Sequence, residues 1–133
     1  MATNILHTFA TAVDAQDMSA TLACFRDDAR LETPHTACIG RDEIAGFFTK
    51  AWSTDPSAKR HFVASPRATW LEPGLVRLET YFSFLGRLPD QSIIGWGEYD
   101  DLVDVSDGVP RFVRLHMQSH LRTDLATGWV AAD

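Results

Sequence analysis

Residues 75–85 read Leu-Val-Arg-Leu-Glu-Thr-Tyr-Phe-Ser-Phe-Leu, a segment in which apolar and polar side chains alternate. An alternation of period two predicts a strand with one buried face. Three more segments of about eleven residues or longer, about twice the usual strand length, have the same character: 61–71, 93–105 and 111–121. Turn residues at 72–74 and 107–108 join them as hairpins. Strands this long must twist, so we expect a strongly curved antiparallel or mixed sheet.

Upstream of this sheet the apolar positions recur every three or four residues, which is the period of a helix. The predicted elements are a helix to about Ala15 capped by Thr3 or Asn4, a short helix capped by Asp17, a strand pair at 29–33 and 35–39, and a helix that begins near Asp42. We therefore expect one α+β domain over residues 1–133, in which the curved sheet wraps around three N-terminal helices.

Charge and composition exclude several classes of partner. The formal net charge is −6 and the arginines are scattered, so a nucleic-acid backbone would be repelled. No segment approaches the roughly 18 apolar residues that cross a bilayer, and the N-terminus does not resemble a signal peptide. The two cysteines, Cys24 and Cys38, are too few for a disulfide framework and lack metal-ligand spacing. We expect a cytoplasmic protein that binds neither nucleic acid nor membranes.

Asp14 is an acidic residue on the apolar face of the first helix, where it continues the spacing of Leu6, Phe9, Ala10 and Val13. An ionised carboxylate at such a position is costly unless a group inside the protein hydrogen-bonds it. His61 opens the first long strand and shares a face with Val63, so its ring is a natural partner. A neutral imidazole can accept a proton near neutral pH, and a buried carboxylate can fix its tautomer and stabilise the imidazolium. The alternative is that Asp14 caps the helix end and that His61 is a half-exposed strand residue.

The C-terminal histidines, His116 and His120, suggest a metal site, which strand geometry excludes. Four residues along a strand span roughly 13 Å, too far for two ligands of one ion. Both alternate with apolar Leu115 and Met117, so we expect them on the outer face of the sheet. The sequence has no glycine-rich phosphate loop, no HExxH and no GxSxG, so we expect neither a metal nor another cofactor.

Four local patterns carry a family resemblance: residues 12–17 with 25–29, Gly40-Arg41-Asp42-Glu43-Ile44, Arg60-His61-Phe62, and Gly97-Glu98-Tyr99-Asp100-Asp101. In this order the chain resembles the cone-shaped, cystatin-like fold of nuclear transport factor 2, ketosteroid isomerase and scytalone dehydratase. Within that superfamily it resembles the SnoaL-like group, which includes polyketide cyclases and a hexachlorocyclohexane dehydrochlorinase. The resemblance implies that Asp14 and His61 are catalytic, and that two copies pair through the outer face of the sheet.

The resulting hypothesis is a cofactor-independent enzyme with an apolar pocket, in which Asp14 and His61 abstract a proton from a small hydrophobic molecule, polycyclic or aromatic. Elimination by a lyase is favoured over isomerisation and polyketide-type cyclisation. Side chains proposed to line the pocket are Phe9, Phe48, Trp52, Val63, Trp96 and His116, although such aromatic residues also form ordinary cores. The alternatives are a non-catalytic ligand-binding or dimerisation protein and an epoxide hydrolase with an Asp-Arg-Asp set.

Overall fold

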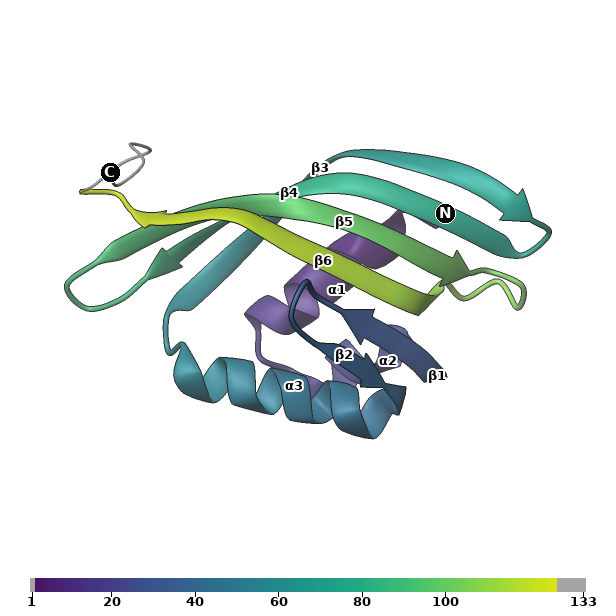
Figure 1. Ribbon diagram of the computed structural model, residues 1–133, viewed down its shortest axis with the longest axis horizontal. Coiled ribbons are helices and arrows are strands. Elements are labelled where there is room, and N and C mark those ends of the chain that lie inside the picture. The colour runs from purple at the N-terminus through teal and green to yellow at the C-terminus, as the bar shows by residue number, and fades with distance from the viewer. Residues whose placement is uncertain (1, 127–133) are drawn as a thin grey trace.

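The computed structural model describes residues 2–126, which form three helices and six strands (Figure 1). The helices are α1 (Asn4–Asp14), α2 (Met18–Ala23) and α3 (Gly40–Thr54). The strands are β1 (Phe25–Glu32), β2 (Ala37–Ile39), β3 (Ala58–Glu72), β4 (Leu75–Arg87), β5 (Ser92–Asp104) and β6 (Arg111–Asp124). Asp17 caps α2 as predicted, because its Oδ1 accepts a hydrogen bond of 2.9 Å from the Ala20 N–H.

One curved sheet contains all six described strands, in the order β2-β1-β6-β5-β4-β3. Neighbouring strands are antiparallel except β1 and β6, which are parallel, so the sheet is mixed. The helices lie against one face, called here the inner face, and no described element covers the long strands on the other, outer face (Figure 1). The α+β cone expected from the sequence is confirmed.

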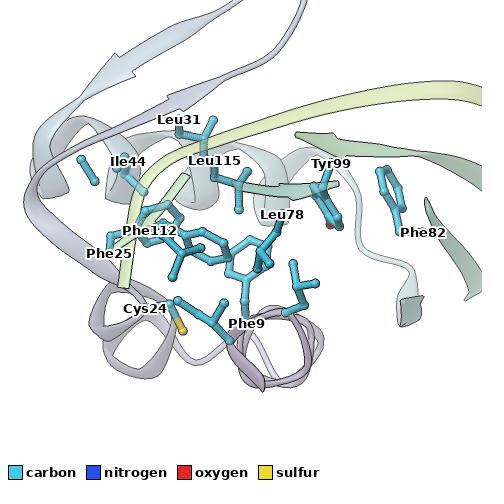
Figure 2. Close-up of a cluster of buried hydrophobic side chains, with 14 of the residues drawn as sticks. Phe9, Cys24, Phe25, Leu31, Ile44, Leu78, Phe82, Tyr99, Phe112 and Leu115 are labelled. Carbon is cyan, nitrogen blue, oxygen red and sulfur yellow. The ribbon is translucent and has the colours of Figure 1, made fainter. Parts of the chain in front are cut away.

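The core lies between α1 and the inner face of the sheet (Figure 2). Phe9 is 3 % exposed, and its ring contacts those of Phe25, Phe48, Tyr99 and Phe112 with centroid distances of 5.5–6.4 Å. These edge-to-face contacts anchor the middle of α1 and therefore fix the position of its last residue, Asp14.

A defined backbone motif ends α1 directly after Asp14. The Gln16 N–H donates to the Val13 carbonyl and the Asp17 N–H to the Ala12 carbonyl, the two bonds of a Schellman motif. Gln16 has φ 53°, a left-handed conformation that glycine adopts more easily. The chain therefore turns sharply, and Asp14 is left at the end of the helix facing β3.

The strand β1 begins earlier than the sequence predicted, at Phe25 instead of Ala29. Phe25 is fully buried and pairs with Phe112 of the parallel neighbour β6, but the pairing shifts before it resumes at Arg30. The charged residues between Phe25 and Arg30 lie where the register shifts, so they do not alternate with apolar residues. The start of β1 therefore could not be recognised from alternation.

Candidate functional site

Asp14 binds His61 with both carboxylate oxygens. Its Oδ1 lies 2.6 Å from His61 Nδ1, and its Oδ2 accepts the His61 backbone N–H at 2.8 Å. The side chains are largely shielded from solvent, with exposed fractions of 9 % for Asp14 and 16 % for His61. A carboxylate at the C-terminus of a helix is disfavoured by the helix dipole, so these two donors supply the stabilisation that the helix cannot.

This arrangement determines which ring nitrogen of His61 is basic. An ionised carboxylate can only accept hydrogen bonds, so Nδ1 carries the proton facing Asp14. In the neutral ring Nε2 then holds the lone pair, and it has no hydrogen-bond partner among the described residues. Nε2 is therefore free to accept a proton, and the adjacent carboxylate would stabilise the resulting imidazolium.

Aromatic rings form one wall beside His61. The imidazole centroid lies 6.3 Å from that of Phe82 and 5.7 Å from that of Phe84. The edges of these rings approach β5 closely because Gly95 and Gly97 have no side chains. A Cβ at Gly95 would come within 2.3 Å of the Phe84 ring, and one at Gly97 within 2.6 Å of the Phe82 ring. The surroundings of His61 on the sheet side are thus apolar.

Two buried acidic groups on β5 extend the inner face beyond His61, and the sequence analysis did not select them. Tyr99 stacks on Phe82 at 4.5 Å, and burial, then the charges of Asp101 and Asp14, raise the pKa of its phenol. Burial raises the pKa of Asp101, which is fully buried, well above its ordinary value. Tyr99 and Asp101 are spaced two residues apart in step with Gly95 and Gly97, so all four positions face inward. This spacing was the sequence signal that could have identified Tyr99 and Asp101.

A groove runs along the seam between α1 and β3 and includes His61. It has a volume of about 450 Å³ and is lined by Thr3, Leu6, His7 and Ala10 of α1 and by His61 and Val63 of β3, among others. We call it the α1–β3 groove. His7 lines this groove because it precedes Asp14 by seven residues, or two helical turns, and so lies on the same face of α1.

The residues predicted to line a pocket beside His61 lie in three different places. Val63 lines the α1–β3 groove. Phe9 and Phe48 are buried in the core and Trp52 packs against it, so the main role of these three residues is core packing. Trp96 and His116 lie on the outer face, and the prediction that they share a pocket with His61 is wrong. Strand parity explains the error for Trp96, because its inward neighbours on β5 are Gly95 and Gly97.

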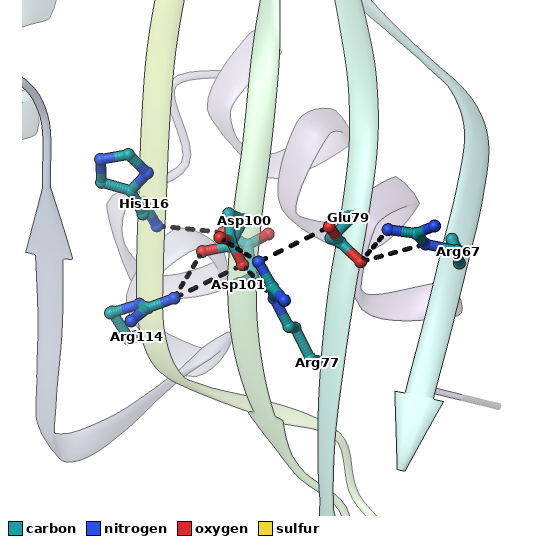
Figure 3. Close-up of polar contacts among 7 residues, drawn as sticks. All are labelled: Arg67, Arg77, Glu79, Asp100, Asp101, Arg114 and His116. Carbon is teal, nitrogen blue, oxygen red and sulfur yellow. Dashed lines mark hydrogen bonds and ion pairs between the residues drawn. The ribbon is translucent and has the colours of Figure 1, made fainter. Parts of the chain in front are cut away.

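The outer face carries a charged network and its own cavity (Figure 3). Arg77 binds both oxygens of Asp100 at 2.8 Å, and Arg67 binds Glu79. The hydrogen bond from Arg77 is the main cause of the lowered pKa of Asp100. A cavity of about 490 Å³ over this network includes His116, as its predicted outward orientation requires. These Asp–Arg pairs lie away from Asp14 and give no support to the epoxide hydrolase alternative.

Residues 2–126 hold neither a metal-binding cluster nor a membrane-spanning helix. No group of three histidine, cysteine, aspartate or glutamate side chains in this range could hold a metal ion. None of its helices is long and apolar enough to span a membrane.

Comparison with known proteins identifies the family. The model of the SnoaL-like domain matches residues 2–116. The chain belongs to the SnoaL-like family. This confirms the resemblance seen in the sequence and the nuclear transport factor 2-like cone fold. No curated protein matches the sequence.

Several solved structures resemble this SnoaL-like chain over most of its length. Hexachlorocyclohexane dehydrochlorinase LinA-type3 from Novosphingobium barchaimii LL02 has a TM-score of 0.82 and 18 % identity, covering 97 % of this chain and 90 % of that one. A candidate scytalone dehydratase from Novosphingobium aromaticivorans has a TM-score of 0.80 and 18 % identity, covering 91 % and 83 %. ActVI-ORFA from Streptomyces coelicolor has a TM-score of 0.74 and 16 % identity, covering 87 % and 92 %. At these identities the likeness shows a shared fold.

Proposed function

We propose that this SnoaL-like protein is a cofactor-independent acid–base enzyme, in which His61 abstracts a proton from a small hydrophobic molecule and Asp14 holds and stabilises its ring. The reaction favoured is an elimination. The observation that carries the proposal is the double hydrogen bond from His61 to Asp14, because it orients the ring and leaves Nε2 as the basic nitrogen.

The proposed step begins with a substrate that has an acidic C–H bond next to a carbon bearing a hydroxyl group or a halogen. His61 Nε2 takes the proton, and the electron pair of the C–H bond forms the carbon–carbon double bond. The leaving group departs with the electron pair of its own bond. Asp14 stabilises the imidazolium until its proton passes to solvent or to the leaving group. Isomerisation and aldol-type cyclisation would share the first proton transfer.

Two kinds of similarity favour elimination among these reactions. The solved structures of similar fold include a hexachlorocyclohexane dehydrochlorinase and a candidate scytalone dehydratase, whose names describe the loss of hydrogen chloride and of water. The apolar rings beside His61 suit a hydrophobic or aromatic substrate and would exclude water from the reacting carbon.

The test compares the wild type with His61→Ala and with His120→Ala, which removes an outer-face histidine. Chloride release from hexachlorocyclohexane and formation of enones from β-hydroxy ketones measure elimination, and exchange of ketone α-protons in D₂O measures proton abstraction alone. We expect His61→Ala to lose about 10²- to 10⁴-fold in rate and His120→Ala to keep the wild-type rate. Equal rates in all three proteins would overturn the role of His61, and a wild type that catalyses none of these reactions would support the non-catalytic alternative.

We also propose that two copies pair through the outer face of the sheet. Phe62, Tyr81 and Trp96 leave 53 %, 57 % and 39 % of their surfaces exposed, and a monomer rarely leaves such an apolar patch in water. Register supports one surface, because Phe62 pairs with Ser83 and Ser83 with Trp96 across three strands. Sedimentation should give a dimer for the wild type and a monomer for Trp96→Glu; a monomeric wild type would contradict the proposal.

The proposed setting is the cytoplasm, with no nucleic acid or membrane as partner. Cys24 and Cys38 are both free and buried, as expected for a protein of a reducing compartment.

A further inference from the structure

His7 is a second histidine of the α1–β3 groove, and the proton abstraction proposed for His61 does not use it. Both residues line the same space of about 450 Å³. His7 is exposed, and no hydrogen bond or ion pair joins its ring to another residue of the range 2–126. The His61 ring, in contrast, is shielded and held by Asp14. An exposed imidazole can exchange protons with solvent between turnovers and act on a molecule in the groove.

The turns of α1 set the separation between the two histidines. His7 lies two turns before Asp14, about 10.5 Å along the helix axis at 1.5 Å per residue. Asp14 binds His61 Nδ1 at 2.6 Å, so His61 lies at the Asp14 end of the groove. Ala10 lies between His7 and Asp14 on the same face of α1, and its methyl group leaves this part of the groove open. A small molecule in the groove therefore lies between the two histidines.

The rest of the groove offers no comparable proton donor. Apart from the two histidines, its described lining consists of Thr3 and of the apolar residues Leu6, Ala10, Phe62, Val63 and Pro66. A threonine hydroxyl donates hydrogen bonds but is too weak an acid for proton transfer near neutral pH. His7 is thus the group in this lining that can protonate an oxygen atom of a substrate held by His61.

The leaving group decides whether an elimination needs such an acid. Hydroxide is a poor leaving group and departs readily only when its oxygen gains a proton. A halide or a carboxylate departs without one. A groove with one basic and one acidic imidazole therefore suits the loss of water better than the loss of a halide.

We propose that His7 is the general acid of the elimination and that the substrates are β-hydroxy carbonyl compounds. The inference rests on the proposed function for the role of His61. His61 Nε2 takes the proton from the carbon next to the carbonyl group, and the electron pair of that C–H bond forms the carbon–carbon double bond. The electron pair of the C–O bond leaves with the oxygen, which takes a proton from the His7 ring.

The products are an α,β-unsaturated carbonyl compound and water, and both histidines return to their starting states by exchange with solvent. The reacting H–C–C–O unit with a contact of about 3 Å at each end spans roughly 8 Å, which is comparable with the separation of about 10.5 Å between the two positions on α1. The same unit is too short to need any space beyond the α1–β3 groove.

The test uses two substrates that give the same product and differ in the leaving group. 4-Hydroxy-4-phenyl-2-butanone loses water, and its acetate ester loses acetate, which needs no proton. The absorbance of the common enone measures both rates. We expect His7→Ala to lower kcat/KM for the alcohol about 10²-fold and to change that for the ester by less than about threefold. His35→Ala, which removes an exposed histidine of a turn, should change neither.

The variant His7→Gln separates proton donation from hydrogen bonding. Glutamine keeps an N–H donor but cannot transfer a proton, so His7→Gln should lose as much dehydration rate as His7→Ala. A wild-type rate in His7→Gln would show that His7 only binds the substrate. Equal losses for the alcohol and the ester in His7→Ala, or no loss for the alcohol, would also overturn the assignment.

Exchange of ketone α-protons in D₂O distinguishes the failure of this inference from the failure of the proposed function. 4-Phenyl-2-butanone has no leaving group, so its exchange should require His61 and be unchanged in His7→Ala. If exchange depends on His61 but dehydration does not depend on His7, the proposed function stands and the role of His7 is wrong. A wild type that exchanges no α-protons would overturn the proposed function and the role of His7 with it.

Discussion

Residues 2–126 contain two histidine–carboxylate pairs of the same length, which differ in burial, in the ring nitrogen used and in their further contacts. His61 Nδ1 lies 2.6 Å from Asp14 on the inner side of the sheet, and His120 Nε2 lies 2.6 Å from Glu98 on the outer face. Asp14 and His61 are 9 % and 16 % exposed, whereas Glu98 and His120 are 48 % and 29 % exposed. Asp14 also holds the backbone of its partner, but Glu98 binds the ring alone. The proposed catalytic role of Asp14 and His61 therefore does not rest on the short distance alone; it rests on burial, the second hydrogen bond and the ring nitrogen left without a partner.

The largest expected effect separates the two carboxylates in catalysis. Asp14→Asn should lower kcat by about 10²- to 10⁴-fold, because an amide cannot hold the ring in the same tautomer or stabilise the imidazolium as well. Glu98→Gln, the matched change on the outer face, should leave kcat unchanged. Rates of proton abstraction from ketones in D₂O measure both, and similar losses in the two variants would remove the distinction.

Asp101 and Asp100 are adjacent residues on opposite faces of β5, and their effects on stability should change with pH in opposite directions. Burial raises the pKa of Asp101 on the inner face, and the hydrogen bond from Arg77 lowers the pKa of Asp100 on the outer face. The stability due to Asp101 is therefore present below the ordinary carboxyl pKa of about 3.9 and is lost as the pH rises towards the raised value, by up to about 1.4 kcal/mol per pH unit.

Urea unfolding of wild type and Asp101→Asn at several pH values checks this prediction. The free energy of unfolding of the wild type should fall relative to Asp101→Asn as the pH rises above about 4. For Asp100 the sign is reversed, so the wild type should lose stability relative to Asp100→Asn as the pH falls through the lowered pKa. Differences that stay constant with pH would show that neither carboxyl is perturbed by folding.

The two pairs should also differ in what they contribute to stability. Asp14→Ala leaves the shielded His61 N–H and ring without an acceptor, which should cost about 1–3 kcal/mol in the free energy of unfolding. Glu98→Ala removes an exposed pair and should change it by no more than about 0.5 kcal/mol. Thermal and urea unfolding measure both, and an equal cost would contradict the difference in burial.

The smallest predicted effect concerns the turn that places Asp14. Gln16 has φ 53° at the position after the helix end, where glycine is favoured. Gln16→Gly should therefore raise the free energy of unfolding by about 0.5–1 kcal/mol and leave the Asp14–His61 contact intact. Gly46→Ala inside α3 makes the reverse type of exchange and serves as a comparison, since the added Cβ would meet no atom within 4 Å. A destabilised Gln16→Gly would show that the turn is held by the glutamine itself.

The sequence analysis was most successful where one periodicity continues without interruption. The alternation in β4 and the capping residue Asp17 predicted their elements, and the spacing around Asp14 identified a carboxylate that needs an internal partner. The outward orientation of His116 on β6 was also predicted, because the alternation of side chains is regular over that part of the strand. Local patterns thus contained most of the fold and the two central residues of the candidate site.

Long-range pairing explains what could not be predicted. The parallel insertion of β1 beside β6, with its break between Phe25 and Arg30, depends on a partner more than 80 residues away. Trp96 was assigned to the wrong face because an aromatic residue is usually buried, whereas here glycines occupy the inward positions so that rings from β4 can lie over them. The position of His7 in the α1–β3 groove depends on how α1 crosses β3, which no local pattern encodes.

The tautomers of the two histidines test the central claim most directly. Two-dimensional ¹H–¹⁵N NMR of the imidazole rings, at a pH where both are neutral, distinguishes the protonated nitrogen from the one with the lone pair. We predict that His61 carries its proton on Nδ1 and His120 on Nε2, and that Asp14→Asn releases His61 from this preference. A neutral His61 protonated on Nε2 in the wild type would contradict the account, because its basic nitrogen would then face Asp14 instead of a substrate.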